Sequence, residues 1–260
     1  MKRVRFRDPA GSIRMGEWID DDGTAADETV AGTKAGRIRF ADRTFDPSSV
    51  ELLAPCEPSK IICIGRNYAA HAAEFDNEVP DRPLLFLKPP NAVAPPDAAV
   101  PMLPGTDRMD FEAELAVVIG EQCRRVDAAK AANVIAGYTA MVDLSNRDDQ
   151  RREQNWIRGK AFDGAAPLGP VVADPTHVPD DARIRLRQNG EVQQDSTIDR
   201  LFFDVPTLIE EITAYLTLEP GDVIATGTPE GVGPVAPGDD IEVEIEGVGR
   251  LQHRIAEAGK

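Results

Sequence analysis

The feature that most constrains the fold is an apolar run, Leu115–Ile119, which two glutamates precede at Glu112 and Glu114. Such a run is typical of a buried β-strand, and residues two apart on a strand point to the same face. The two carboxylates would therefore converge at the start of a core strand. Burying them without a cation would cost several kcal/mol or keep one of them protonated, so the pattern indicates a bound metal ion. A solvated charged face shows this spacing more often, and on spacing alone it stays open.

A third carboxylate, Asp143, ends the segment Gly137–Asp143 and completes a candidate metal site with Glu112 and Glu114. Ligands that are all oxygen favour Mg²⁺, Mn²⁺ or Ca²⁺ over zinc. We therefore expect these three side chains to hold a divalent cation from that group.

His71 and Glu74 follow a predicted buried strand, Ile61–Gly65. Their spacing of three makes them neighbours on a helical turn. A carboxylate beside an imidazole raises its basicity and fixes its orientation, as a general base for water requires. The alternative is a solvated helix with an incidental ion pair. We predict His71 as the base because His177 and His253 lie in segments without a comparable partner.

Arg147, Gln150 and Lys160 lie close in sequence to Asp143 and offer cationic or amide donors. A lysine can neutralise a developing negative charge, and an arginine can grip a carboxylate with two hydrogen bonds. These residues would give an anionic substrate its counter-charges in an otherwise acidic protein. Surface residues that balance nearby acids explain the charges equally well.

The segment Ala225–Pro234 is dense in glycine and proline and carries the hydroxyls of Thr226 and Thr228. Its backbone amides could hold an anion, and a tight connection between strands is equally natural. It lacks the residue order of Walker loops and of dinucleotide-binding loops.

Composition and charge limit the functional class. The chain of 260 residues is 42% apolar and 28% charged, which is typical of a soluble globular protein. No stretch approaches the roughly 18 apolar residues of a membrane span and no signal peptide is evident, so we expect a cytoplasmic protein. A net charge of -16 opposes nucleic acid or an anionic membrane as a partner.

The balance of charged residues resembles that of proteins from salt-loving cytoplasms, because 45 acidic residues stand beside 22 arginines and only seven lysines. High ionic strength screens the self-repulsion of such a chain. We therefore expect a halophilic protein, and an ordinary acidic enzyme from a GC-rich genome is the alternative.

Strands dominate the expected α+β fold. Short strand-like runs at 4–6 and 38–40, separated by Gly-rich and acidic turns, predict a small β-rich N-terminal domain over residues 1–55. A catalytic domain would cover residues 56–260 and include a strand over 241–246 in which apolar and acidic residues alternate.

Few helices are expected. Asp127 would cap a short helix that ends at Ile135, and Pro206 would open another with apolar residues at helical spacing. The proline-rich stretch 89–104 should be irregular.

Together these segments resemble the fumarylacetoacetate hydrolase superfamily over about residues 56–250. Several motifs in order make the resemblance specific for the family, although not for one substrate, because members share the site while performing hydrolysis, decarboxylation, isomerisation, hydration or lyase chemistry. The motifs are Gly65-Arg66-Asn67-Tyr68 with His71 and Glu74, Leu87-Lys88-Pro89, Asp110–Leu115, Gly137–Asp143 with Arg147, Asp148 and Gln150, Arg158–Asp163 with Pro167–Pro170, and Thr226–Gly233.

The resemblance implies a catalytic domain built as a mixed β-sandwich roll, usually in a homodimer, with Mg²⁺ or Mn²⁺ at the three carboxylates. The roles of the other site residues rest on it as well. Lys160 would sit beside the metal, Arg147 and Gln150 would contact the substrate, Thr228 would bind its carboxylate or oxo group, and the loop with His71 and Glu74 would close as a lid.

The expected function is metal-dependent cleavage of a carbon–carbon bond in a small 2-oxo or 4-acyl-2-oxo acid, as in an acylpyruvase, with oxaloacetate decarboxylation as a related activity. The alternative is isomerisation of a 2-hydroxyhepta-2,4-diene-1,7-dioate or 5-carboxymethyl-2-hydroxymuconate in aromatic acid catabolism. A non-catalytic binding or scaffold protein of the same fold is an alternative from another class. Loss of a metal ligand or of the His71–Glu74 pair would favour it, and the sequence keeps both.

Overall fold

The computed structural model describes residues 1–19 and 36–258 and confirms a strand-dominated α+β fold. The strands are β1 (Lys2–Arg7), β2 (Ile13–Ile19), β3 (Arg37–Phe40), β4 (Arg43–Phe45), β5 (Glu51–Leu53), β6 (Ile61–Gly65), β7 (Leu84–Lys88), β8 (Val93–Ala94), β9 (Ala99–Pro101), β10 (Met109–Phe111), β11 (Ala113–Ile119), β12 (Ile135–Val142), β13 (Ser145–Asn146), β14 (Ala166–Ala173), β15 (Arg183–Gln188), β16 (Glu191–Thr197), β17 (Val223–Ala225), β18 (Gly233–Pro234), β19 (Asp240–Ile245) and β20 (Gly249–Ala256). The α-helices are α1 (Ala69–Glu74), α2 (Arg147–Arg152), α3 (Ile157–Lys160) and α4 (Val205–Tyr215).

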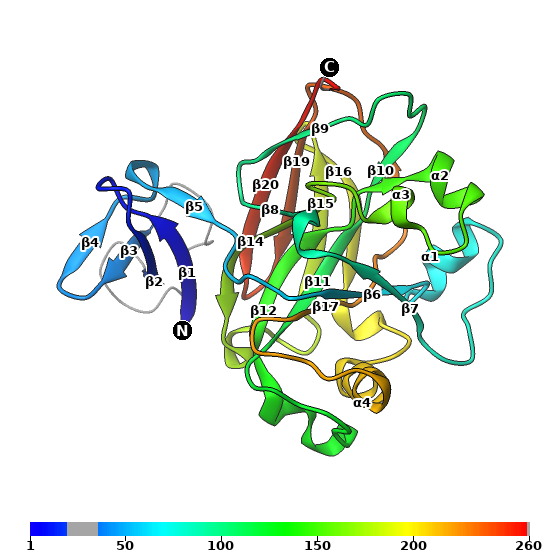
Figure 1. Ribbon diagram of the computed structural model, residues 1–260, viewed down its shortest axis with the longest axis horizontal. Helices are drawn as coiled ribbons and strands as arrows, with labels where there is room; N and C mark the ends of the chain where they lie inside the picture. The colour runs from blue at the N-terminus through cyan, green and yellow to red at the C-terminus, as the bar shows by residue number, and fades with distance from the viewer. Residues whose placement is uncertain (20–35, 259–260) are drawn as a thin grey trace.

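Strands β1 to β5 form a small unit, drawn in blue beside the rest of the molecule in Figure 1. β1 pairs antiparallel with β2 and β5, and side chains such as Phe6 and Trp18 are buried. Both strand-like runs predicted in this region are therefore strands, while the acidic turn between them falls in residues 20–35, outside the described residues. The first two residues of β1 also pair with β14, which joins the unit to the main sheet.

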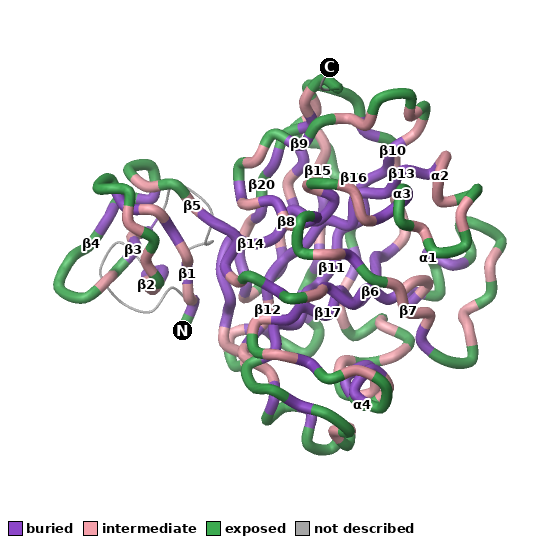
Figure 2. Tube along the Cα trace, in the orientation of Figure 1, coloured by how far each residue is buried: buried purple, intermediate pink, exposed green. Residues whose placement is uncertain are grey.

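The main sheet has the order β4-β3-β2-β1-β14-β12-β11-β17-β6-β7, so β11 and β12 lie inside it. A second sheet, β16-β15-β19-β20-β9, shares one hydrophobic cluster with it, which includes Leu115, Val142, Val243 and Leu251. Figure 2 shows the inner strands of this sandwich as largely buried. The alternation predicted over 241–246 appears in β19, whose apolar residues face this core.

β11 is buried along its whole length, as its apolar run predicts. Leu115 packs in the cluster shared with the second sheet, whereas Ala116 and Val118 pack in a cluster with Ile61 and Val223. Both faces of β11 are thus covered, and any charged group at its start must lie inside the protein.

Two predictions about local structure differ from what the structure shows. Residues 128–134 form a 3₁₀-helix instead of an α-helix, the Asp127 side chain makes no capping bond, and Ile135 already belongs to β12. The stretch 89–104 was expected to be irregular, but it contains β8 and β9, each in a parallel pair. The non-proline residues between the prolines keep the N–H groups that such pairing needs.

Helix α4 begins close to the predicted position. Asp204 caps it by accepting a hydrogen bond from the Thr207 amide at 2.9 Å, and Pro206 lies in the first turn, where no N–H is needed. Its buried face, with Leu208 and Ile212, packs against a cluster that includes Ile62 of β6. Among the described residues no helix is long and apolar enough to cross a membrane.

Candidate metal centre and active site

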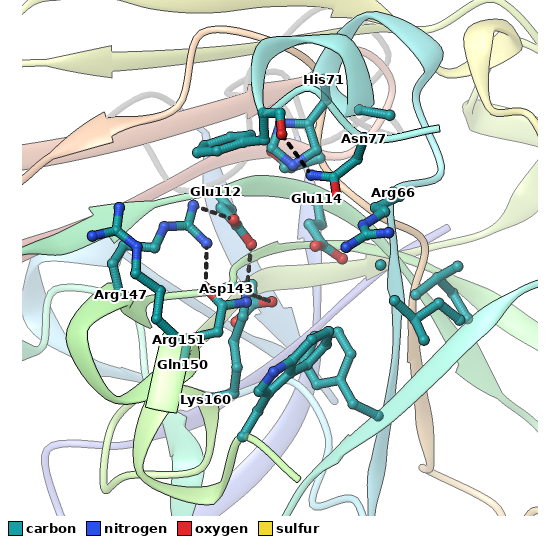
Figure 3. Close-up of a pocket in the computed structure, with 18 residues that line it drawn as sticks. Arg66, His71, Asn77, Glu112, Glu114, Asp143, Arg147, Gln150, Arg151 and Lys160 are labelled. Carbon is teal, nitrogen blue, oxygen red and sulfur yellow. Dashed lines mark hydrogen bonds and ion pairs between the residues drawn. The ribbon is translucent and has the colours of Figure 1, made fainter. Parts of the chain in front are cut away.

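The candidate site is a cavity of about 260 Å³ that collects side chains from between Ile64 and Thr228. The lining residues come from the start of β11, the end of β12, the helices α1, α2 and α3, and the loop after β17 (Figure 3). All nine residues that the sequence analysis selected for the site belong to this region, and eight of them line the cavity. These eight are His71, Glu112, Glu114, Asp143, Arg147, Gln150, Lys160 and Thr228.

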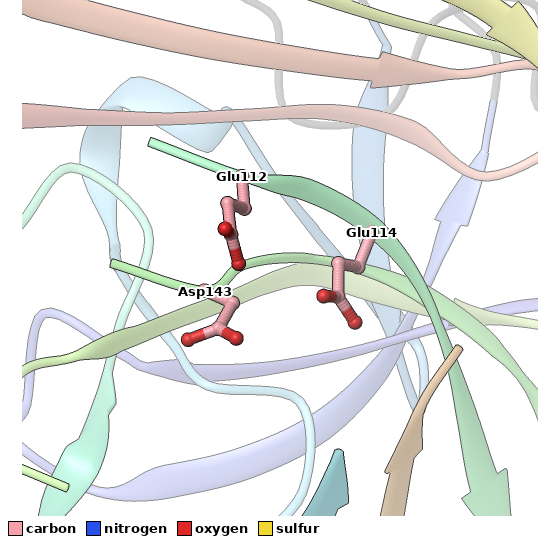
Figure 4. Close-up of side chains that lie close together, drawn as sticks. All are labelled: Glu112, Glu114 and Asp143. Atoms are coloured by element: carbon pink, nitrogen blue, oxygen red, sulfur yellow. The ribbon is translucent and has the colours of Figure 1, made fainter. Parts of the chain in front are cut away.

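Glu112, Glu114 and Asp143 form the centre of the site (Figure 4). One carboxylate oxygen from each lies within 4.8 Å of the others, and all three residues are buried. Sheet register explains the convergence: Ala113 of β11 pairs with Val142 of β12, and the Asp143 amide donates to the Glu112 carbonyl at 2.8 Å. Antiparallel pairing therefore brings a carboxylate after β12 to the two at the start of β11.

Two cations hold Glu112. Lys160 Nζ donates to Glu112 Oε2 and Asp143 Oδ2, both at 2.6 Å, and Arg147 Nη2 donates to Glu112 Oε1 at 2.5 Å (Figure 3). Burial raises the pKa of Glu112, but the charges of Lys160 and Arg147 outweigh it and hold that pKa well below its usual value. Glu112 is thus a stable carboxylate inside the protein.

Glu114 has the opposite environment. Its Oε2 accepts a hydrogen bond from the Gly227 amide at 2.9 Å, and no cation in the described residues forms an ion pair with it. Burial, Asp143 and Glu112 all raise its pKa well above the usual value. Asp143 Oδ1 is also buried, and it forms an ion pair with Lys88 Nζ at 2.7 Å but accepts no aligned hydrogen bond from the described part of the chain. A divalent cation fits this set, because it would supply the positive charge that Glu114 lacks to ligands that are all oxygen.

His71 and Glu74 meet on helix α1 as predicted. His71 Nδ1 lies 3.2 Å from Glu74 Oε2, and Glu74 Oε1 accepts a hydrogen bond from the Gly231 amide at 2.7 Å. Nδ1–H donation to a carboxylate leaves Nε2 as the basic nitrogen of a neutral ring. Glu74 therefore orients the His71 ring at the cavity wall and also attaches helix α1 to the loop after β17.

The loop 226–233 does bind anions through its backbone, but these are carboxylates of the protein itself. The Gly227 and Gly231 amides donate to Glu114 and Glu74. Thr228 lines the cavity, and its hydroxyl accepts a hydrogen bond from Gln194 Nε2 at 2.9 Å. Both interpretations of the sequence therefore meet here, since this loop is a tight connection that also positions charged side chains.

Arg147 is engaged within the protein. Besides Glu112, it donates to Asp110 Oδ2 and to Gln150 Oε1, each at 2.8 Å. Its clear structural role is to hold Glu112, and its contact with a substrate stays a prediction, as does that of Gln150.

Three buried residues that support the site were given no individual role in the sequence analysis, although Asn67 and Lys88 belong to its motifs. Asn67 Nδ2 donates to the Thr226 carbonyl at 2.8 Å, Gln194 Oε1 accepts from the Ala113 amide at 2.9 Å, and Lys88 lies 2.7 Å from Asp143 Oδ1. Lys88 offered a signal, because it is a charged residue at the end of an apolar strand. Gln194 offered none, because it is one polar residue among many in β16.

Comparison with known proteins shows what this chain is similar to. Residues 60–256 match the family model for the fumarylacetoacetate (FAA) hydrolase C-terminal domain. The chain is 38% identical to 5-carboxymethyl-2-hydroxymuconate delta-isomerase from Mycobacterium smegmatis, with a TM-score of 0.88 and 100% of both chains covered. It is 34% identical to fumarylpyruvate hydrolase from Pseudomonas aeruginosa in complex with Mn²⁺ and pyruvate, with a TM-score of 0.73 over 84% of this chain and 94% of that one. A third relative is the 4-hydroxyphenylacetate degradation bifunctional isomerase/decarboxylase of Escherichia coli, 42% identical over 75% of this chain and 46% of that protein.

Proposed function

Since this chain belongs to the fumarylacetoacetate hydrolase family, we propose that it is a metal-dependent enzyme that cleaves a carbon–carbon bond in a small 2-oxo or 4-acyl-2-oxo acid. One observation carries the proposal: the three buried carboxylates and the His71–Glu74 pair line or adjoin the same cavity. The relative with Mn²⁺ and pyruvate supports Mg²⁺ or Mn²⁺ as the ion. By family expectation the working form is a homodimer.

The residues present support the following steps for the proposed hydrolysis. A divalent ion at Glu112, Glu114 and Asp143 would supply a Lewis acid for the 2-oxo and carboxylate oxygens of the substrate. His71 Nε2 takes a proton from water while Glu74 keeps the ring oriented. The hydroxide attacks the distal carbonyl, the C3–C4 bond breaks, and its electron pair moves toward the 2-oxo oxygen. The ammonium of Lys160 offsets this charge, and the proton returns to C3.

The second candidate is isomerisation of an unsaturated 2-hydroxy dioate, and Arg66 favours it. This residue lines the cavity with a left-handed φ of +58°, a conformation that is uncommon outside glycine and is found at functional sites. Its guanidinium has no ion pair in the described part of the chain, so it is available for a distal carboxylate. In that reaction His71 would carry a proton from the 2-hydroxyl oxygen to C5 of the substrate as the enol becomes a 2-oxo acid.

Turnover assays separate these candidates. The purified protein, with Mg²⁺ and after chelation, is offered acetylpyruvate, oxaloacetate and a 2-hydroxymuconate-type dioate. Release of pyruvate and acetate that requires metal supports the hydrolase, whereas an absorbance change only with the dioate supports the isomerase. Activity that survives complete chelation would overturn metal dependence in either case.

A further inference from the structure

Lys88, the last residue of β7, is a fully buried lysine outside the mechanism above. It does not line the cavity, so it has no access to a substrate. Burying an ammonium group costs several kcal/mol unless it is paired and its protons are hydrogen-bonded. Its surroundings therefore show what the charge is used for.

Hydrogen bonds from Lys88 join the segments that carry the site. Its Nζ donates to the carbonyl oxygens of Leu144 at 3.4 Å, Ala165 at 3.1 Å and Lys160. With Asp143 Oδ1, these carbonyls surround the ammonium group with four acceptor oxygens for its three protons. Leu144 follows Asp143, Lys160 ends α3, and Ala165 precedes β14. One side chain thus fixes the backbone beside a predicted metal ligand and beside the predicted catalytic lysine.

The charge of Lys88 is directed at Asp143. Nζ lies 2.7 Å from Oδ1, while Oδ2 accepts a hydrogen bond from Lys160 at 2.6 Å. Nζ is closer to Oδ1 than to the Leu144 or Ala165 carbonyl, so the carboxylate and the carbonyls share the protons of the ammonium group. The carboxylate is held in place by this ion pair, and Oδ1 keeps a second lone pair that a cation can use.

We propose that Lys88 is a positioning residue that orients Asp143 for binding of the divalent ion, an inference that rests on the metal site of the proposed function. A competing effect is simple repulsion between the ammonium and the ion, which would make loss of Lys88 improve metal affinity. Orientation dominates here, because the carbonyl contacts fix the lysine and its ion pair fixes the Asp143 carboxylate, which keeps further lone pairs for the ion.

The test measures Mn²⁺ affinity of the full-length protein by calorimetry and by electron paramagnetic resonance, independently of turnover. Lys88→Met should weaken Mn²⁺ binding on the order of 10- to 100-fold, as expected when a residue that orients a metal ligand is lost. The matched control is Lys60→Met, which removes a lysine from another buried carboxylate, Asp222, away from the cavity. This control should keep the wild-type Kd within about twofold even if it lowers stability.

A double-mutant cycle distinguishes positioning from general damage. Once Asp143→Asn has removed the ligand charge, adding Lys88→Met should weaken Mn²⁺ binding little further, because the two residues act through one contact. A folded Lys88→Met protein with unchanged or tighter Mn²⁺ binding overturns the inference, as does an additive cycle. If Lys88→Met does not fold, Lys88→Gln, which also removes the charge, replaces it in the same measurements, with the same two results decisive. Absence of Mn²⁺ binding by the wild-type protein would instead overturn the proposed metal site itself.

Discussion

At the scale of single residues, the site is a balance between buried acids and buried cations. Glu112 has two cations beside it and Glu114 has none among the described residues, although only one residue separates them. Alternation along the strand places both carboxylates in the same site, but residues of α2 and α3 provide cations to Glu112 alone. A divalent ion beside Glu114 would offset the electrostatic cost of burying that second carboxylate.

Replacing Glu114 by glutamine should weaken Mn²⁺ binding and metal-dependent turnover on the order of 100-fold, while the metal-free protein keeps its stability at neutral pH. The raised pKa of Glu114 decides in which direction the stability of the metal-free protein changes with pH. The metal-free folded state favours the protonated acid, so stability from this group is present at low pH and is lost as pH rises through its folded-state pKa. Glutamine keeps that neutral state at every pH.

The same pKa predicts proton release on metal binding, since the ligand must be ionised. Calorimetry in buffers of different ionisation enthalpy measures it, and wild-type Mn²⁺ affinity should rise with pH. Glu114→Gln should release fewer protons. Equal proton release by both proteins, or wild-type affinity in the variant, would show that Glu114 is not a ligand.

His71→Ala should separate two chemistries of one site. Hydrolysis of an acylpyruvate needs a base for water and should fall about 10²- to 10⁴-fold. Decarboxylation of oxaloacetate needs chiefly the metal and should persist to a large extent. Parallel assays at saturating Mg²⁺ make the comparison, with Glu74→Gln as a milder variant that leaves the imidazole in place. Equal loss of both reactions would mean that His71 does more than activate water.

At the scale of elements, strands and their faces followed from local patterns, and supporting contacts did not. The alternation in β19 and the apolar run of β11 are properties of short segments, so both strands were predictable. The pairing of β8 and β9 depends on distant partners, and so does the contact of Gln194 with the loop after β17. The three carboxylates were predictable because a divalent cation needs oxygen ligands. The role of Lys88 could be inferred only from the structure, which places the end of β7 beside Asp143.

β20 carries a buried histidine that predicts sensitivity to acid. His253 alternates with Leu251 and Ile255 toward the core, and neither ring nitrogen has a hydrogen-bond partner within residues 1–19 and 36–258. Burial lowers its pKa from 6.5 to about 3. The folded state therefore resists protonation, and stability from this group is full above pH 6.5 and is lost as pH falls toward 3.

By this linkage, His253 should cost about 2 kcal/mol of unfolding free energy at pH 5 relative to pH 7.5. His253→Leu removes the effect. The free energy of unfolding of the variant minus that of the wild type should therefore be larger at pH 5 than at pH 7.5 by that amount. Urea unfolding of both proteins at each pH measures the difference. The contributions of acidic residues to the pH dependence cancel in this comparison, because those residues titrate in both proteins. A difference that is the same at both pH values would contradict the prediction.

At the scale of the whole molecule, the net charge of -16 sets how stability responds to salt. Some charges are paired locally, as in the second sheet, where Arg187 contacts Glu242 and Glu244 and Arg183 contacts Asp195. Exposed pairs contribute little and weaken in salt. Repulsion among the excess acids has the greater effect, and salt screens it over distances beyond the Debye length, about 10 Å at 0.1 M and 3 Å at 1 M.

We therefore propose that the protein is adapted to salt and expect its free energy of unfolding to rise between about 0.1 and 1 M NaCl. Neutralising three exposed acids outside the site, as Asp180→Asn, Glu191→Gln and Glu257→Gln, should raise stability at low salt and reduce the slope. Urea melts across a NaCl series give both values, and sucrose controls for effects of solute exclusion. If repulsion is the cause, the variant and the wild type converge at high salt, because screening leaves little repulsion for the substitutions to remove. A gain that is constant at all salt concentrations would show instead that the three side chains act through local contacts, and the acidic composition would then reflect something other than salt adaptation.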